Sequence, residues 1–181
     1  MPLAPEYFTA DMVRALPDDG QRYELVWGEL LVNPSPASRH QRIVGRLFYL
    51  LTVYCDALGS LETMFSPADI SWGTDTLVQP DVFVVPKTQA RASDWAAKQT
   101  LALVAEVLSP STARHDRFQK RRLYQAQGVG TLWLADPDRR TIEVWTPERA
   151  FPVIETERVS WQPAGAGAPL IIELTPLFAD A

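Results

Sequence analysis

Apolar residues recur at helical spacing in several parts of the chain, and this pattern predicts which segments are helices. The longest helix is expected from Ser38 to about Leu58, with Gly59 just beyond its end. A basic helix is expected over Thr112–Gln127, closed by Gly128, and a short helix over Thr9–Leu16. The apolar residues of the longest helix share one face: Ile43, Leu47, Leu50, Leu51 and Tyr54.

The remaining apolar stretches predict strands. Leu101–Leu108 is an almost unbroken apolar run, which is typical of a strand covered on both faces. Other strands are expected at Arg22–Val32 (bent at Trp27-Gly28), Leu61–Phe65, Ala68–Trp72, Leu77–Val85, Thr131–Ala135, Thr141–Trp145, around Val153 and at Leu170–Leu174. The polar stretch Lys87–Lys98 is expected to be helical or irregular. This order predicts an α/β or α+β fold, a mixed sheet flanked by helices, in one domain spanning residues 1–181.

Composition limits the kind of protein and the kind of metal site. Of the 181 residues, 46% are hydrophobic and 22% charged, as in soluble globular proteins. No apolar run approaches the roughly 20 residues that cross a bilayer, and no signal peptide is expected. Cys55 is the single cysteine, which suits a reducing cytoplasm. With only His40 and His115 beside it, a zinc cage is excluded, and any metal must be held by oxygen atoms.

Two acidic residues lie at or within apolar strands. Glu106 interrupts LALVAEVL, where a buried carboxylate needs a metal, a cation or hydrogen bonds. Asp81 follows Pro80 at the start of the apolar run VFVV. Taken alone, Glu106 can be a strand-end or paired glutamate, and Asp81 part of a turn. If the strands are neighbours, the two carboxylates converge and select Mg²⁺ or Mn²⁺.

Two further residues can complete such a site. Lys120 follows the Glu106 strand and shares a helix face with Asp116 and Tyr124 at spacings of four residues. Its ammonium can orient a water or stabilise charge on a reacting phosphate; the alternative is a solvated helix pair with Asp116. Glu24, in the first strand, can complete the metal shell or be an ordinary exposed glutamate.

The net charge of −5 argues mildly against a protein that grips DNA over a wide surface. A local basic strip, formed by Arg114, Arg117, Lys120, Arg121 and Arg122, can offset this total. The candidates for contact with a substrate are His40, Arg117, Arg121 and Tyr124. His40 starts the long helix, where a capping or surface role is the simpler interpretation.

Five segments resemble the Uma2 family, which is commonly described as candidate restriction endonucleases. They are RYELVWGELLV, PSPASRHQRIVGRL, VQPDVFVV, LVAEVLSPSTARHDRFQKRRLY and GVGTLWLADPDRRTIEVW, in the family's order and over nearly the whole chain. The resemblance implies the PD-(D/E)XK nuclease fold, with Asp81 as the motif Asp and Glu106 as the second acid. Leu108 stands where that motif usually has lysine, and Lys120 would supply the amine instead. Glu24 would be the family's amino-terminal acid.

The leading hypothesis is a Mg²⁺- or Mn²⁺-dependent endonuclease that hydrolyses DNA. In it Asp81, Glu106 and Glu24 ligate the metal, and Lys120 assists the water or the transition state. A homodimer is reasonable because duplex cleavage needs two strand scissions. A second hypothesis is a catalytically silent protein on the same fold that binds nucleic acid or a partner, since no separate DNA-reading motif is present. A weaker third is a hydrolase of a small phosphorylated molecule.

Overall fold

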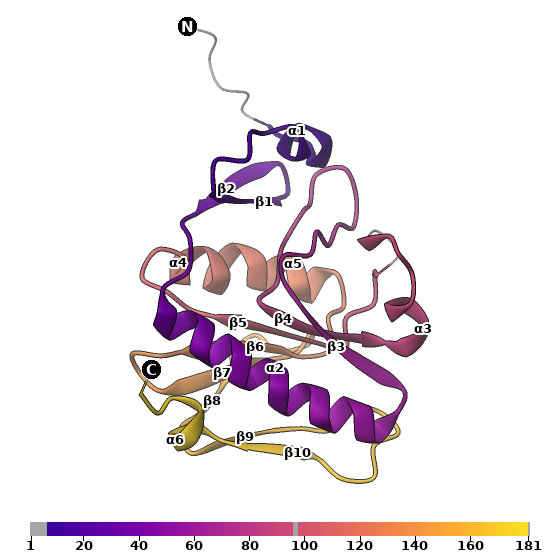
Figure 1. Cartoon of the computed structure of the whole chain (residues 1–181), viewed down its shortest axis with the longest axis vertical. Helices are drawn as coiled ribbons and strands as arrows, with labels where there is room; N and C mark the ends of the chain where they lie inside the picture. The colour runs from indigo at the N-terminus through magenta and orange to yellow at the C-terminus, as the bar shows by residue number, and fades with distance from the viewer. Residues whose placement is uncertain (1–6, 96–97, 181) are drawn as a thin grey trace, which may run out of the picture.

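The computed structural model describes residues 7–95 and 98–180, and its centre is a six-stranded sheet (Figure 1). The strands lie in the order β3-β4-β5-β6-β7-β8. Strands β5 and β6 are parallel, and the other neighbouring pairs are antiparallel, so the predicted mixed sheet is confirmed. The strands are β3 (Leu61–Phe65), β4 (Val82–Pro86), β5 (Leu103–Val107), β6 (Leu132–Asp136), β7 (Thr141–Trp145) and β8 (Val153–Glu155).

Helices cover both faces of this sheet. Helix α2 (Ser38–Leu58) lies on one face, and a second helical segment lies on the other (Figure 1). Alternate residues of β4 serve the two faces: Val82 packs in the core beneath α2, and Phe83 packs in the core with Leu123. The second segment consists of α4 (Ala113–His115), a π-helical turn η2 (Asp116–Lys120) and α5 (Arg121–Ala126).

A separate hairpin stands at one end of the molecule beside α1 (Ala10–Arg14) (Figure 1). Its turn residues Trp27 and Gly28 have φ of 49° and 80°, the left-handed pair that a two-residue hairpin turn requires. The backbones of Leu25 and Leu77 exchange hydrogen bonds of 2.6 and 2.9 Å, which join the hairpin to the loop before β4. The hairpin strands are β1 (Arg22–Val26) and β2 (Glu29–Asn33).

The C-terminal part packs against α2 and shares its hydrophobic core. Arg46 of α2 donates to the carbonyl oxygens of Leu177 and Ala179, at 2.9 and 2.5 Å, and Arg42 donates to that of Asp180. These arginines therefore hold the last described residues against the helix. The elements are β9 (Arg158–Trp161), β10 (Leu170–Glu173) and α6 (Leu174–Leu177).

The predicted helix Ser38–Leu58 is confirmed, and two predicted strands are corrected. Ala68–Trp72 is not a strand, because only Ile70 forms a bridge there, to Val78. The strand expected at Leu77–Val85 begins only at Val82, because Pro80 has no N–H to donate to a ladder. Strand β9 and helix α6 were not predicted.

The polar stretch predicted as helical or irregular contains one short helix, α3 (Lys87–Ala90). Residues 96 and 97 of that stretch lie outside the described residues. Within residues 7–95 and 98–180, no helix is both long and apolar enough to cross a membrane.

Candidate active site

Asp81 and Glu106 lie side by side at the same end of neighbouring strands. The register pairs Val82 with Ala105, which places Asp81 opposite Glu106 and on the same sheet face. Each carboxylate accepts a backbone N–H from the other strand: Asp81 N–H donates to Glu106 Oε2 at 3.3 Å, and Val107 N–H donates to Asp81 Oδ2 at 2.9 Å. Both side chains are buried. The two predicted acids therefore meet.

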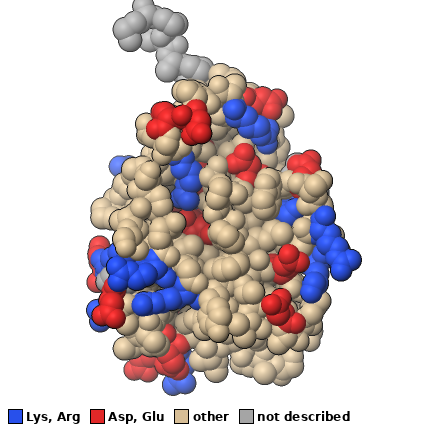
Figure 2. Space-filling model, viewed as in Figure 1, with Lys and Arg blue, Asp and Glu red and all other residues tan. Residues whose placement is uncertain are grey.

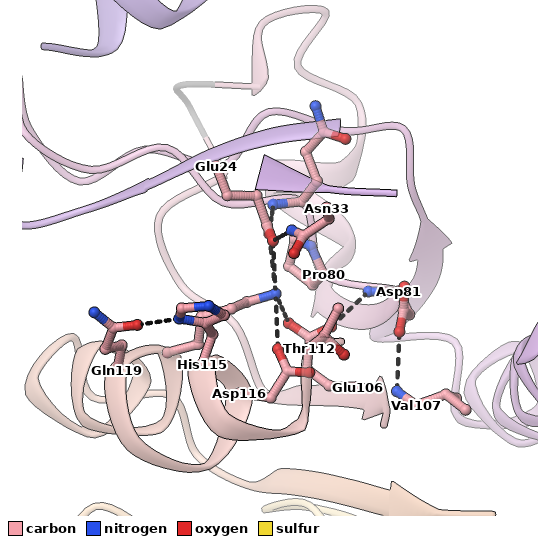
Figure 3. Close-up of polar contacts among 12 residues, drawn as sticks. Glu24, Asn33, Pro80, Asp81, Glu106, Val107, Thr112, His115, Asp116 and Gln119 are labelled. Carbon is pink, nitrogen blue, oxygen red and sulfur yellow. Dashed lines mark hydrogen bonds and ion pairs between the residues drawn. The ribbon is translucent and has the colours of Figure 1, made fainter. Parts of the chain in front are cut away.

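Lys120 brings a positive charge to this point. Its ammonium lies 2.7 Å from Glu106 Oε1, 2.9 Å from Glu24 Oε1 and 3.5 Å from Asp116 Oδ1. The Lys120 side chain is only 2% exposed. Figure 3 shows Glu24 approaching from the hairpin side, with Glu106 and Asp116 opposite it. We call Glu24, Glu106, Asp116 and Lys120 the buried charge cluster.

Glu24 enters the cluster from β1. The side chain is fully buried, and Asn33 Nδ2 donates to its Oε2 at 2.6 Å. The backbone N–H of Gln79 donates to Glu24 Oε1 at 2.7 Å. The hairpin and the loop before β4 thus fix this carboxylate, which no local sequence pattern alone could place beside Lys120.

The π-helical turn directs three side chains into the cluster. Asp116 and Lys120 are its first and last residues, and Tyr124 follows one turn later. The Tyr124 hydroxyl donates to Glu106 Oε1 at 2.6 Å, so this oxygen faces both a phenol and an ammonium. The shared face predicted for these three residues is present, and π-helical turns are frequent at functional sites.

Asp81 has its own partners on the opposite side from Lys120. His40 Nε2 lies 3.1 Å from Asp81 Oδ2, and Arg22 donates to Asp81 Oδ1 at 3.2 Å. His40 is buried at the start of α2, so it is neither a simple cap nor a surface residue. Arg22 was not singled out from the sequence, although it precedes Glu24 by two residues and shares its face of β1.

The surroundings shift the ionisation of the two acids in opposite directions. Burial raises the pKa of Asp81, but His40, Arg22 and Lys120 outweigh it and bring the pKa to about 2. Burial raises the pKa of Glu106 to about 8, with Asp81 and Asp116 adding to the rise against the opposing charge of Lys120. Widely separated pKa values of adjacent groups are typical of functional sites.

The pKa values of Lys120, Tyr124 and His40 are all raised. Burial lowers the pKa of Lys120, but the charges of Glu106 and Glu24 raise it well above its usual range, so the amine is protonated at neutral pH. Burial and the charge of Glu106 raise the pKa of Tyr124 well above its usual range, so the phenol is neutral. The pKa of His40 is raised because its hydrogen bond with Asp81 outweighs burial.

Two arginines of the predicted basic strip are engaged with other side chains, and the other two are exposed. Arg117 donates to Asp136 Oδ2 and to Glu143 Oε1, both at 2.7 Å, and Arg121 stacks on Trp145 with its guanidinium 4.5 Å from the ring centre. These two arginines do not join the buried charge cluster. On the face in Figure 2, Lys and Arg side chains lie in separate groups with uncharged surface between them.

The chemical type of the donor atoms at this point suits a hard divalent cation. Glu24, Asp81 and Glu106 offer only carboxylate oxygens, and the Lys120 ammonium between Glu24 and Glu106 is a stand-in cation in that space. Within the described part of the chain, no three His, Cys, Asp or Glu side chains are grouped so that they could hold a metal ion as they stand. Metal binding therefore calls for a rearrangement of the ammonium and the carboxylates.

Comparisons with known proteins agree with this architecture. Residues 10–173 match the Uma2 family, described as "Putative restriction endonuclease". The chain belongs to the Uma2 family. The crystal structure of a "putative nuclease belonging to DUF820 from Anabaena variabilis ATCC 29413" matches with a TM-score of 0.78 at 21% identity. The match covers 94% of this chain and 97% of that one, so this Uma2 protein shares its fold. No curated protein matches the chain.

The family and the fold class predicted from the sequence are thus confirmed. Sequence reasoning missed Arg22 and Asn33, which hold Asp81 and Glu24. It treated Asp116 only as a partner on the helix surface, whereas Asp116 is buried in the cluster. The alternation Arg22-x-Glu24 and the hairpin pairing of Arg22 with Asn33 were the signals available.

Proposed function

We propose that this Uma2 protein is a cytoplasmic endonuclease that uses Mg²⁺ or Mn²⁺ to hydrolyse DNA phosphodiester bonds. The observation that carries the proposal is the burial of Lys120 among the carboxyl groups of Glu24, Glu106 and Asp116, with the Asp81 backbone hydrogen-bonded to Glu106. Burial, with the nearby Asp81 and Asp116, raises the pKa of Glu106 to about 8, and strongly perturbed acids of this kind are frequent at functional sites, which favours a functional over a structural cluster. The family's description as a restriction endonuclease agrees with this chemistry.

Asp81 and Glu106, completed by Glu24, would hold the metal. When bound, it supplies an activated water and neutralises charge on the phosphate. After the rearrangement that metal binding calls for, Lys120 would donate hydrogen bonds to the reacting phosphate or to the attacking water. Tyr124 and Asn33 fix the orientation of Glu106 and Glu24, and His40 fixes Asp81. A homodimer would present two such sites to the two strands of a duplex.

The test is cleavage of plasmid and oligonucleotide DNA with Mg²⁺ or Mn²⁺ by the wild-type protein and two variants. Asp81→Asn removes the carboxylate charge with little change in shape, and we expect cleavage to fall by about 100-fold or more. The control is Asp56→Asn, which changes an exposed aspartate of α2 and is expected to cleave normally. Equal cleavage by Asp81→Asn and wild type would reject the assignment.

A second candidate is a catalytically silent protein on the same fold, favoured by the net charge of −5. Titration with Mn²⁺ separates the two. Tight binding that Glu106→Gln abolishes supports the enzyme, and absence of binding supports the silent protein. A panel of duplex DNA, single-stranded DNA, RNA and small phosphorylated nucleotides then identifies the substrate and tests the third possibility, hydrolysis of a small molecule.

A further inference from the structure

Three adjoining hollows meet at Arg22, outside the buried charge cluster. Their volumes are about 430, 240 and 180 Å³, and Arg22 lines all of them. Its side chain is 26% exposed and donates to Asp81 at 3.2 Å. Arg22 is therefore the point at which a molecule lying in these hollows reaches Asp81.

The hollow of about 240 Å³ has an aromatic ring on its wall, and we call it the Phe65 hollow. Phe65 ends β3 and is 53% exposed, with its ring edge-on to Phe48 at 4.6 Å between centres. Asp81 and Arg22 line the same hollow. An exposed, supported ring beside a cation provides a stacking surface for a nucleobase next to a phosphate contact.

The hollow of about 180 Å³ is rich in hydroxyl groups, and we call it the Ser111 hollow. Its wall includes Ser35, Ser109, Ser111 and Thr112 together with Arg22. The Ser111 and Ser109 hydroxyls lie 3.0 Å apart, and those of Ser109 and Thr112 lie 3.1 Å apart. Hydroxyl groups and arginine are the groups that position phosphate and sugar oxygens. This gives a role to Ser109 and Ser111 of the S-P-S-T stretch, whose Thr112 also hydrogen-bonds Asp116 of the buried charge cluster.

The charges in these hollows favour one strand over a duplex. Among the described residues that line the Phe65 and Ser111 hollows, Arg22 is the single Lys or Arg. A duplex held by its backbones needs several phosphate contacts, because each neutralised phosphate contributes to affinity by counterion release. Arg117 and Arg121 of the basic strip line neither hollow.

We infer that the Phe65 and Ser111 hollows bind a single-stranded or locally unpaired segment of nucleic acid, an inference that rests on the proposed nuclease function. Phe65 stacks on a base, Arg22 contacts the phosphate beside Asp81, and the hydroxyls of the Ser111 hollow hold the neighbouring sugar-phosphate. A site of this kind cuts one strand at a time and needs no second copy of the chain.

Binding tests this directly, with Ca²⁺ replacing Mg²⁺ so that the probe stays intact. The probes are a fluorescent oligothymidylate and a duplex of equal length, measured by anisotropy. We expect the single strand to bind at least about tenfold more tightly than the duplex, and Phe65→Ala to weaken it by about tenfold while Phe65→Trp restores it. Phe118→Ala is the matched control, because Phe118 is 56% exposed but lines a different hollow.

The salt dependence of the same binding tests Arg22. Arg22→Gln removes one phosphate contact, so the slope of log affinity against log salt should become shallower by about 0.7. The exposed Arg158, in β9, provides the control Arg158→Gln, whose slope should not change. Thermal unfolding of each variant confirms that it is folded.

Cleavage by the same proteins in Mg²⁺ distinguishes failure of the single-strand inference from failure of the proposed nuclease function. If the wild type cleaves DNA but Phe65→Ala and Phe118→Ala bind and cleave alike, or if duplex binds as tightly as the single strand, the inference is wrong and the nuclease stands. If the wild type cleaves no nucleic acid with either metal, the proposed function fails and the inference fails with it.

Discussion

Two cations three residues apart on the π-helical turn have opposite surroundings. Arg117 is 25% exposed, lies beside the paired strands β6 and β7, and forms two hydrogen-bonded ion pairs with Asp136 and Glu143. Lys120 is 2% exposed and faces three carboxylates, with a fourth, Asp81, beside Glu106. The two cations of one helical turn thus enter different sets of partners: Arg117 joins a partly exposed network of ion pairs, and Lys120 joins a fully buried cluster in which the pKa of Glu106 is raised to about 8.

Arg117 and Lys120 differ in how their charges are matched by the acids around them. The planar guanidinium of Arg117 matches two carboxylates directly, which suits a structural tie between η2 and strands β6 and β7. The Lys120 ammonium is a point charge that lies among three acids, and burial together with Asp81 and Asp116 raises the pKa of Glu106 to about 8. Strongly perturbed acids next to open hollows are typical of functional sites.

Of the two cations, Lys120 should matter more for stability, so the largest loss is expected for Lys120→Met. Removing the amine leaves buried carboxylates without their cation, so the free energy of unfolding should fall by about 3–5 kcal/mol in metal-free buffer. Chemical denaturation measures this loss. If the site binds a metal as proposed, Mn²⁺ should raise the melting temperature of Lys120→Met more than that of the wild type. A variant as stable as the wild type without metal would contradict the contrast.

A smaller effect is expected for Arg117→Met. The substitution leaves Asp136 and Glu143 without the guanidinium. Because solvent partly reaches the Arg117 side chain, we expect the free energy of unfolding to fall by only about 1–2 kcal/mol. DNA cleavage per folded molecule should stay close to that of the wild type. A hundredfold loss of cleavage with a normal fold would instead place Arg117 in contact with the substrate.

The smallest effect on stability is expected from the ionisation of Asp136 as the pH is lowered. Burial raises the pKa of Asp136, but the Arg139 amide and the Arg117 guanidinium outweigh it, so the pKa lies below its usual value of 3.8. The ionised form therefore stabilises the fold above pH 3.8, and this contribution disappears as the pH falls through the lowered pKa. Asp136→Asn should be less stable than the wild type at neutral pH, and the gap should close in strong acid. Urea titrations across this range measure it.

Much of the site follows from the sequence because apolar runs mark buried strands. Glu106 stands out in LALVAEVL, and an acid there must have compensating partners, which the structure supplies as Lys120 and Tyr124. The helical spacing of Asp116, Lys120 and Tyr124 correctly placed them on one face. The mixed sheet followed from the order of helices and strands.

The rest depends on contacts that no local pattern contains. The position of Glu24 is set by how the hairpin packs on the loop before β4, through Leu25 and Leu77. The basic strip could not be interpreted from the sequence because two of its arginines, Arg117 and Arg121, find their partners on β6 and β7. The strand expected from Leu77 begins only at Val82, after Pro80, and the π-helical turn has no marker in the hydrophobic periodicity.

The contact between Glu24 and Lys120 joins residues 96 positions apart. Contacts of such sequence separation form late, because the intervening chain must first be ordered. A nascent polypeptide still on the ribosome lacks this contact until Lys120 has left the exit tunnel and β5 has found its neighbours. In the proposed nuclease, the active site would therefore stay incomplete throughout most of the chain's own synthesis.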